Sequence, residues 1–84
     1  MREYTTKELF SAACAGDIPT LRDYYDNGGK PNRRLDRFRK LHSLIAGALR
    51  NRETPTVYFL LSRGETAEPA EQEQLDEFLR RRTA

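Results

Sequence analysis

The sequence has little of the material from which most catalytic and metal-binding sites are built. Its 84 residues include one cysteine (Cys14), one histidine (His42) and no tryptophan. A single cysteine excludes an internal disulfide and a cage of several thiolates around zinc. No apolar stretch approaches the roughly 18 residues that a membrane-spanning helix requires. The first ten residues lack the apolar segment of a secretory signal, so we expect a cytoplasmic protein with no membrane partner.

Apolar residues are also scarce for a chain that must fold on its own. Hydrophobic residues make up 37% of the sequence and charged residues 33%, whereas soluble domains are usually about 45–50% apolar. At this length we expect one domain, whose small core barely offsets an ordering cost of about 1.5 kcal/mol per residue. Support from a partner protein or from a second copy, in a homodimer, is therefore expected.

The N-terminal third carries the signals of two short helices. Thr5 and Glu8 have the spacing of a capping box, and the helix that follows is predicted to end at Gly16. Asp17 is placed to cap a second helix with Pro19 in its first turn. The pattern therefore predicts a helix–turn–helix pair.

A charged, turn-rich loop follows at residues 30–40, and three further helices are predicted after it. The first spans about residues 40–50, where the apolar residues at helical spacing are Leu41, Leu44, Ile45, Ala48 and Leu49. The second is capped by Thr54 and has Pro55 just inside it. The third begins near Pro69, with acidic residues early and basic residues late, as the helix dipole favours. We therefore predict an all-α fold.

One helix–turn–helix unit occurs twice in the sequence. Residues 17–29 and 53–65 align with an offset of 36 and share a proline, a threonine and a glycine. This alignment sets Tyr24 and Tyr25 against a Leu-Leu pair, so both tyrosines are predicted to lie in the core. The preceding helices align with an offset of 32, as LFSAA against LHSLI. Two short helices and a turn-rich loop that recur after about 33 residues are typical of ankyrin repeats.

The first unit resembles the ankyrin repeat family in specific residues. The segment LFSAACAGDIPTLRDYYDNGGKPN is similar to the family pattern of Leu-x-x-Ala-Ala-x-x-Gly-(His/Asp), a second helix, and then Gly-Ala-x-x-Asn. The matching positions are Leu9, Ala12, Ala13, Gly16, Asp17, Leu21, Gly28 and Asn32. The second unit is degenerate, with Arg39 and Lys40 where the family has Thr and Pro. The resemblance implies repeats at about residues 5–37 and 38–67 and a capping helix at about 69–82.

No set of residues has catalytic spacing. His42 echoes the histidine at the family's helix start, where a structural hydrogen bond is expected. Cys14 lies among alanines and is predicted to be a small buried hydrophobe. We expect no enzymatic activity, no cofactor and no bound metal.

The clearest functional signal is the basic segment at residues 30–40. Its basic residues are Lys30, Arg33, Arg34, Arg37, Arg39 and Lys40. They accompany one acid, Asp36, and one aromatic residue, Phe38. Arginine and aromatic side chains are enriched at interface hot spots, so the segment predicts binding to an acidic protein surface. Alternatives are an inert, solvated loop in a protein that mainly self-assembles, or nucleic-acid binding, which the slight net charge of +2 disfavours.

The resemblance adds candidate contact residues on the helices. Ankyrin proteins bind partners with their loop tips and with the exposed face of the first helices. The corresponding residues here are Arg37, Phe38 and Arg39 on the loop, and Cys14, Ala15, Ala46 and Gly47 on the helices. The resemblance thus implies a small adaptor or inhibitor, and so compact a chain suits a modulator encoded by a bacterium or a phage.

Overall fold

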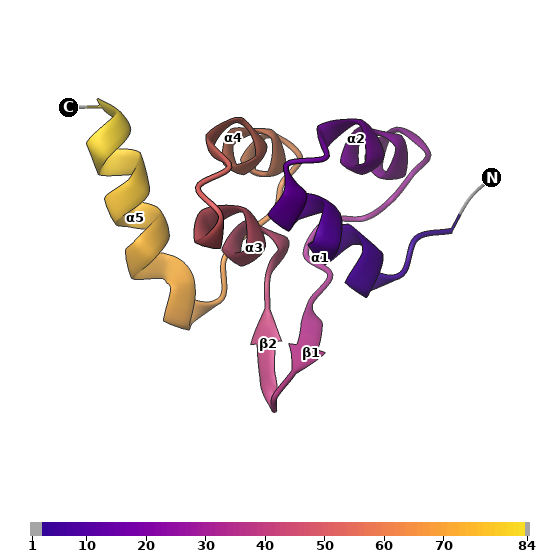
Figure 1. The fold of residues 1–84 in the computed structure, drawn as a ribbon, viewed down its shortest axis with the longest axis horizontal. Coiled ribbons are helices and arrows are strands. Elements are labelled where there is room, and N and C mark those ends of the chain that lie inside the picture. The colour runs from indigo at the N-terminus through magenta and orange to yellow at the C-terminus, as the bar shows by residue number, and fades with distance from the viewer. Residues whose placement is uncertain (1–2, 84) are drawn as a thin grey trace.

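The computed structural model describes residues 3–83, which are mostly helical. In chain order the elements are α1 (Thr6–Ala15), α2 (Ile18–Asp26), β1 (Leu35–Arg37), β2 (Lys40–His42), α3 (Leu44–Arg50), α4 (Thr54–Ser62) and α5 (Pro69–Thr83). Figure 1 shows the α1–α2 pair beside the α3–α4 pair, with the β1–β2 hairpin pointing away from both. The broadly helical fold is confirmed, but the prediction of a purely all-α chain is wrong because of this hairpin.

The first helix pair has the caps that its sequence predicts. The Glu8 backbone N–H donates to the Thr5 hydroxyl at 3.1 Å, and the Thr5 N–H donates to the Glu8 carboxylate at 3.0 Å. Gly16 ends α1 with a φ of 70°, in the left-handed region that glycine adopts without strain. The Asp17 carboxylate then accepts hydrogen bonds from the N–H and the hydroxyl of Thr20 at 3.3 and 2.6 Å. Local sequence alone therefore sets the start, the stop and the turn of this pair.

The second helix pair repeats the backbone hydrogen bonds of the first, 36 residues later. The equivalent bonds are Asp17 N–H to Ala12 O and Glu53 N–H to Ala48 O, and Gly29 N–H to Tyr24 O and Glu65 N–H to Leu60 O. The offset of 32 predicted for the first helices is wrong, because Leu41 and His42 lie in β2 rather than in α3. Thr54 is also not the cap of α4. The N-cap is Glu53, whose side chain makes no capping hydrogen bond.

The hairpin occupies residues 35–42, where the sequence predicts a loop and the start of a helix. The antiparallel register pairs Arg37 with Lys40, so only Phe38 and Arg39 form the turn. Their φ angles are 54° and 59°. Positive φ at both central residues defines a type I′ turn, whose twist matches that of two antiparallel strands. The turn could not be predicted from the sequence, because its two central residues are Phe-Arg rather than the usual Asn-Gly or Asp-Gly.

The hairpin delays the start of α3. The Ser43 hydroxyl caps this helix by accepting from the Ala46 N–H at 3.2 Å. The helix therefore begins at Leu44 rather than near residue 40. Leu41, predicted on the apolar stripe of that helix, instead lies on β2 with 52% of its surface exposed.

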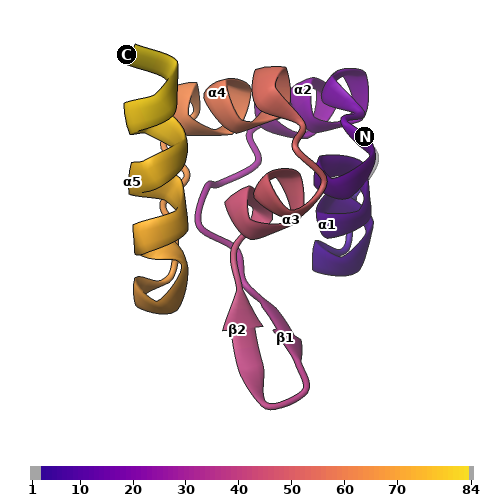
Figure 2. The ribbon, with the colours of Figure 1, turned by 60° about the vertical axis from the view of Figure 1, so that its left-hand side comes forward.

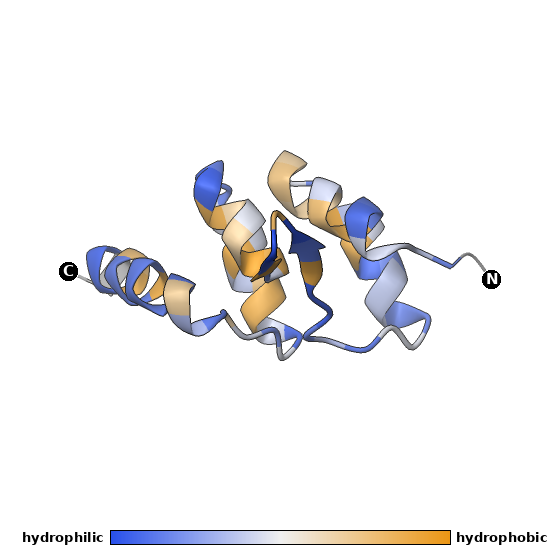
Figure 3. Cartoon of the chain, turned by 90° about the horizontal axis from the view of Figure 1, so that it is seen from below, coloured by the Kyte–Doolittle hydropathy of each residue, from blue (hydrophilic) through white to orange (hydrophobic). Residues whose placement is uncertain are grey.

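The core lies between the two helix pairs. Its buried apolar residues are Leu9, Phe10, Ala12, Ala13, Leu21, Tyr24, Tyr25, Leu44, Ile45, Ala48, Val57, Leu60 and Leu75. Both tyrosines are therefore buried as predicted. In Figure 3 hydrophilic colours dominate α5 and the hairpin, whereas hydrophobic residues are more frequent on the helices to either side of the hairpin.

The C-terminal helix α5 lies against the outer side of the second pair (Figure 2). Leu75 is its buried residue. Its start is fixed by Glu71, whose carboxylate accepts from the Ser43 hydroxyl at 2.5 Å and from the Glu68 N–H at 2.9 Å. One side chain thus caps α5 and joins it to the start of α3. Within residues 3–83, no helix combines the length and apolarity needed to cross a membrane.

Candidate interaction site at the hairpin tip

The most exposed aromatic residue of the described chain stands at the turn of the hairpin. Phe38 has 84% of its surface exposed. Figures 1 and 2 show the turn as the end of the molecule farthest from the helices. A left-handed backbone at bulky Phe38 and at Arg39 costs of order 1–3 kcal/mol each. We call residues 37–40 the hairpin tip.

Basic side chains surround Phe38. The Arg37 guanidinium lies over the Phe38 ring, 5.2 Å from its centroid. Arg39 and Lys40 are exposed beside it. The acid of this segment, Asp36, is paired with Leu41 one step away from the turn. The hairpin tip thus presents one apolar ring within a cationic rim.

Arg33 and Arg34 are predicted to bind a partner, but in the structure their side chains bond to other residues of the same chain. Arg33 donates to the backbone carbonyl of Tyr4 at 2.8 Å. Arg34 forms an ion pair with Glu68 at 2.7 Å and donates to the Thr66 hydroxyl at 3.1 Å. Both arginines therefore tie the loop before β1 to other parts of the fold, and they stand apart from the hairpin tip.

Asn32 belongs to the same connection. Its backbone has a left-handed φ of 73°. Its side-chain oxygen accepts hydrogen bonds from the N–H and the hydroxyl of Thr66 at 2.8 and 2.9 Å. The loop at residues 30–34 is thus bound to the loop at residues 64–68.

Cys14 and Gly47 meet where α1 crosses α3. A Cβ atom at Gly47 would lie 2.9 Å from the Cys14 sulfur and 3.3 Å from the Phe10 ring. Burial raises the pKa of the Cys14 thiol, and the Arg50 and Arg37 guanidiniums offset this only in part. Cys14 is half-buried at this crossing, where the sequence predicts a buried residue, and its raised pKa disfavours the thiolate.

The other predicted residues of the helices lie in different surroundings. Ala46 is half-buried in the first turn of α3. Ala15 is exposed and lines a hollow between α1 and α2. His42 is half-buried with its ring edge against Phe10, at a centroid distance of 6.2 Å. The structure thus brings Arg37, Phe38, Arg39 and Lys40 together and leaves the other predicted residues outside the tip.

Sequence reasoning misses two features near the candidate site. The first is the type I′ turn, for which the Phe-Arg dipeptide gives no signal. The second is the buried Glu65, whose carboxylate accepts from the Tyr25 hydroxyl at 2.5 Å. Its other oxygen has no hydrogen-bond partner among residues 3–83. From the sequence, a glutamate directly after a helix-ending glycine is expected to be an exposed loop residue. Its burial is therefore seen only in the structure.

The chemistry available at the hairpin tip is that of recognition. Guanidinium groups stay protonated and donate bidentate hydrogen bonds to carboxylates. Among residues 3–83, no three His, Cys, Asp or Glu side chains lie close enough to hold a metal ion. Comparisons of the chain with protein families, with curated proteins and with solved structures found no match.

Proposed function

We propose that this protein is a non-enzymatic interaction module, an adaptor or inhibitor, that docks its hairpin tip onto an acidic surface of a partner protein. The observation that carries the proposal is the exposed Phe38 held on a strained turn between basic residues. Strained backbone is typically retained at functional sites. An aromatic ring with flanking arginines has the composition of an interface hot spot.

We also propose that the fold is ankyrin-like. Supporting this are the two helix pairs with the same hydrogen bonds 36 residues apart and the hairpin that projects from between them. Asn32, after the first pair, stands where the family pattern has asparagine. On this proposal the hairpin tip corresponds to the loop tips through which ankyrin proteins bind their partners.

A protein partner fits this surface better than a nucleic acid. Strong electrostatic binding to a duplex commonly uses about 6–10 phosphate contacts. Arg33 and Arg34 are engaged within the fold, which leaves three basic residues at the tip. One apolar ring with a short cationic rim suits a pocket lined by carboxylates.

Affinity capture from lysate of the source cells, with and without nuclease treatment, tests the proposal. The charge-reversal variant Arg37→Glu/Arg39→Glu should lose the captured protein. A control variant, Arg80→Glu/Arg81→Glu, makes the same change of charge on α5 and should retain it. Equal capture by both variants, or capture that nuclease abolishes, would count against a protein partner at the hairpin tip.

A further inference from the structure

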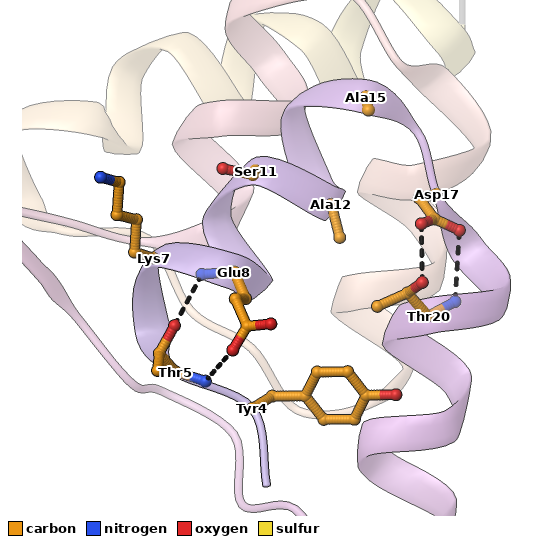
Figure 4. A pocket seen from close by; sticks show the side chains of 9 residues that line it. All are labelled: Tyr4, Thr5, Lys7, Glu8, Ser11, Ala12, Ala15, Asp17 and Thr20. Carbon is orange, nitrogen blue, oxygen red and sulfur yellow. Dashed lines mark hydrogen bonds between the residues drawn. The ribbon is translucent and has the colours of Figure 1, made fainter. Parts of the chain in front are cut away.

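A hollow of about 580 Å³ is lined by residues of α1 and α2 and of the segment before α1. In Figure 1 these two helices form the end of the molecule opposite α5. The lining residues are Tyr4, Thr5, Lys7, Glu8, Ser11, Ala12, Ala15, Asp17 and Thr20. Figure 4 shows α1 and α2 as its two walls. The hollow is distinct from the hairpin tip and shares none of its residues.

The internal repeat of the chain indicates what kind of surface this is. The residues 36 positions after Ser11 and Asp17 are Gly47 and Glu53. Gly47 packs against Cys14 in the first pair, and Glu53 packs against Gly16. Ser11 and Asp17 thus occupy the positions through which the second pair docks onto the first. The hollow therefore lies on the surface that corresponds, within the repeat, to the surface with which the second pair packs on the first.

Head-to-tail stacking of copies cannot fill this hollow. The complementary surface would be the outer side of the α3–α4 pair, and α5 lies against that side. A second copy that presents its own α1–α2 surface is not blocked in this way. Such a contact is closed and twofold symmetric.

A twofold axis through the hollow would bring opposite charges of the two copies together. In Figure 4 Lys7 lies on one flank of α1, and Asp17 and Glu8 lie on the other. Lys7 is exposed and makes no ion pair with any other described residue. A twofold axis along the hollow exchanges the flanks and sets the Lys7 ammonium of each copy beside the acidic flank of the other.

We propose that the protein forms a reversible homodimer through the α1–α2 hollow, with Lys7 of each copy facing Asp17 and Glu8 of the other. Nine lining residues are few beside the roughly 20–30 residues a side of a stable interface. The dimer is therefore weak, and because its exposed charges are screened by salt, it weakens further at high ionic strength.

Sedimentation equilibrium on the full chain, from about 10 μM to 1 mM and at low and high salt, tests this inference. The average mass should rise from monomer toward dimer with concentration. Lys7→Glu and Ser11→Arg should remain monomeric, because the first reverses the charge and the second fills the hollow. Ser11→Ala keeps a small residue there and should dimerise like the wild type.

Lys7 and Ser11 are both exposed on α1, so we expect their variants to fold. Circular dichroism on each variant checks this. A wild type that stays monomeric at 1 mM would overturn the inference. A Lys7→Glu or Ser11→Arg variant that is folded and still dimerises would overturn it too. The hairpin variant Arg37→Glu/Arg39→Glu should dimerise normally, so the outcome is independent of the partner proposed for the hairpin tip.

Discussion

At the scale of single residues, the backbone at Phe38 and Arg39 is the most informative feature. Both residues hold positive φ angles at a turn where glycine and asparagine are favoured. The side chains there are exposed and add little to the core. Their cost to stability therefore supports the proposal that the hairpin tip binds a partner.

Replacing the turn with Phe38→Asn/Arg39→Gly should stabilise the protein. Asparagine and glycine adopt left-handed φ readily, although the contact of Arg37 with the Phe38 ring is lost. We expect a net gain of about 1 kcal/mol, which raises Tm by roughly 4–8 °C in a domain of this size. Thermal unfolding followed by circular dichroism measures it, and an unchanged or lower Tm would show that the turn is not strained.

Gly47→Ala should destabilise the fold by about 1–3 kcal/mol, because the new methyl group enters the space of the Cys14 sulfur and the Phe10 ring. Cys14→Ala removes one of these obstacles and should recover part of the loss. A double-mutant cycle by urea unfolding measures the coupling between the two positions. Additive effects would mean that a methyl group at position 47 does not contact the Cys14 side chain.

Tyr25→Phe should cost about 1–3 kcal/mol at neutral pH, because it leaves the buried Glu65 carboxylate without its donor. Burial and the hydrogen bond to Glu65 raise the pKa of the Tyr25 hydroxyl above its ordinary value of 10.0. The stability that this hydroxyl contributes is complete below pH 10 and is lost as pH rises above it. The difference between wild type and variant should therefore shrink above about pH 10. Urea unfolding at pH 7 and at pH 11 checks this, and a constant difference would contradict it.

At the scale of elements, two loops distant in sequence hold the hairpin and α5 in place. The loop at residues 30–34 reaches the loop at residues 64–68 through Asn32 and Arg34. Glu71 then joins the start of α5 to Ser43. The arginines of one basic segment thus divide into structural residues before β1 and exposed residues at the turn.

This division predicts that two charge reversals differ in their effect on stability. Arg34→Glu sets a carboxylate against Glu68 and should cost about 2 kcal/mol or more. Arg37→Glu lies on an exposed strand and should change stability by less than about 0.5 kcal/mol. Chemical unfolding of both variants is the measurement. Equal losses would mean that the two arginines play the same role.

The same elements show what sequence reasoning could reach. The capping box at Thr5, the cap at Asp17 and the start of α5 are local signals, and the structure confirms them. The hairpin was missed because its turn depends on two non-glycine residues in left-handed conformations. Because the apolar spacing places Leu41 on a helix, the sequence predicts an offset of 32 for the first helices, four residues short of the observed 36.

At the scale of the whole molecule, two surfaces are separated by the helical core. The hairpin tip projects from one end, and the α1–α2 hollow opens on the N-terminal side. The basic segment could be predicted from sequence as a region of interest. Which of its arginines are exposed could not, because Arg33 and Arg34 find partners at Tyr4 and Glu68 only in the folded chain.

Photo-crosslinking from position 38 tests the central claim most directly. Benzoylphenylalanine in place of Phe38 should give one covalent adduct with an acidic protein in source-cell lysate, and Arg37→Glu/Arg39→Glu in the same chain should abolish it. The matched control places the same photoreactive residue at Tyr58, an aromatic position on α4 that is 42% exposed, and should give no adduct. No adduct from position 38, or the same adduct from both positions, would contradict a binding site at the hairpin tip.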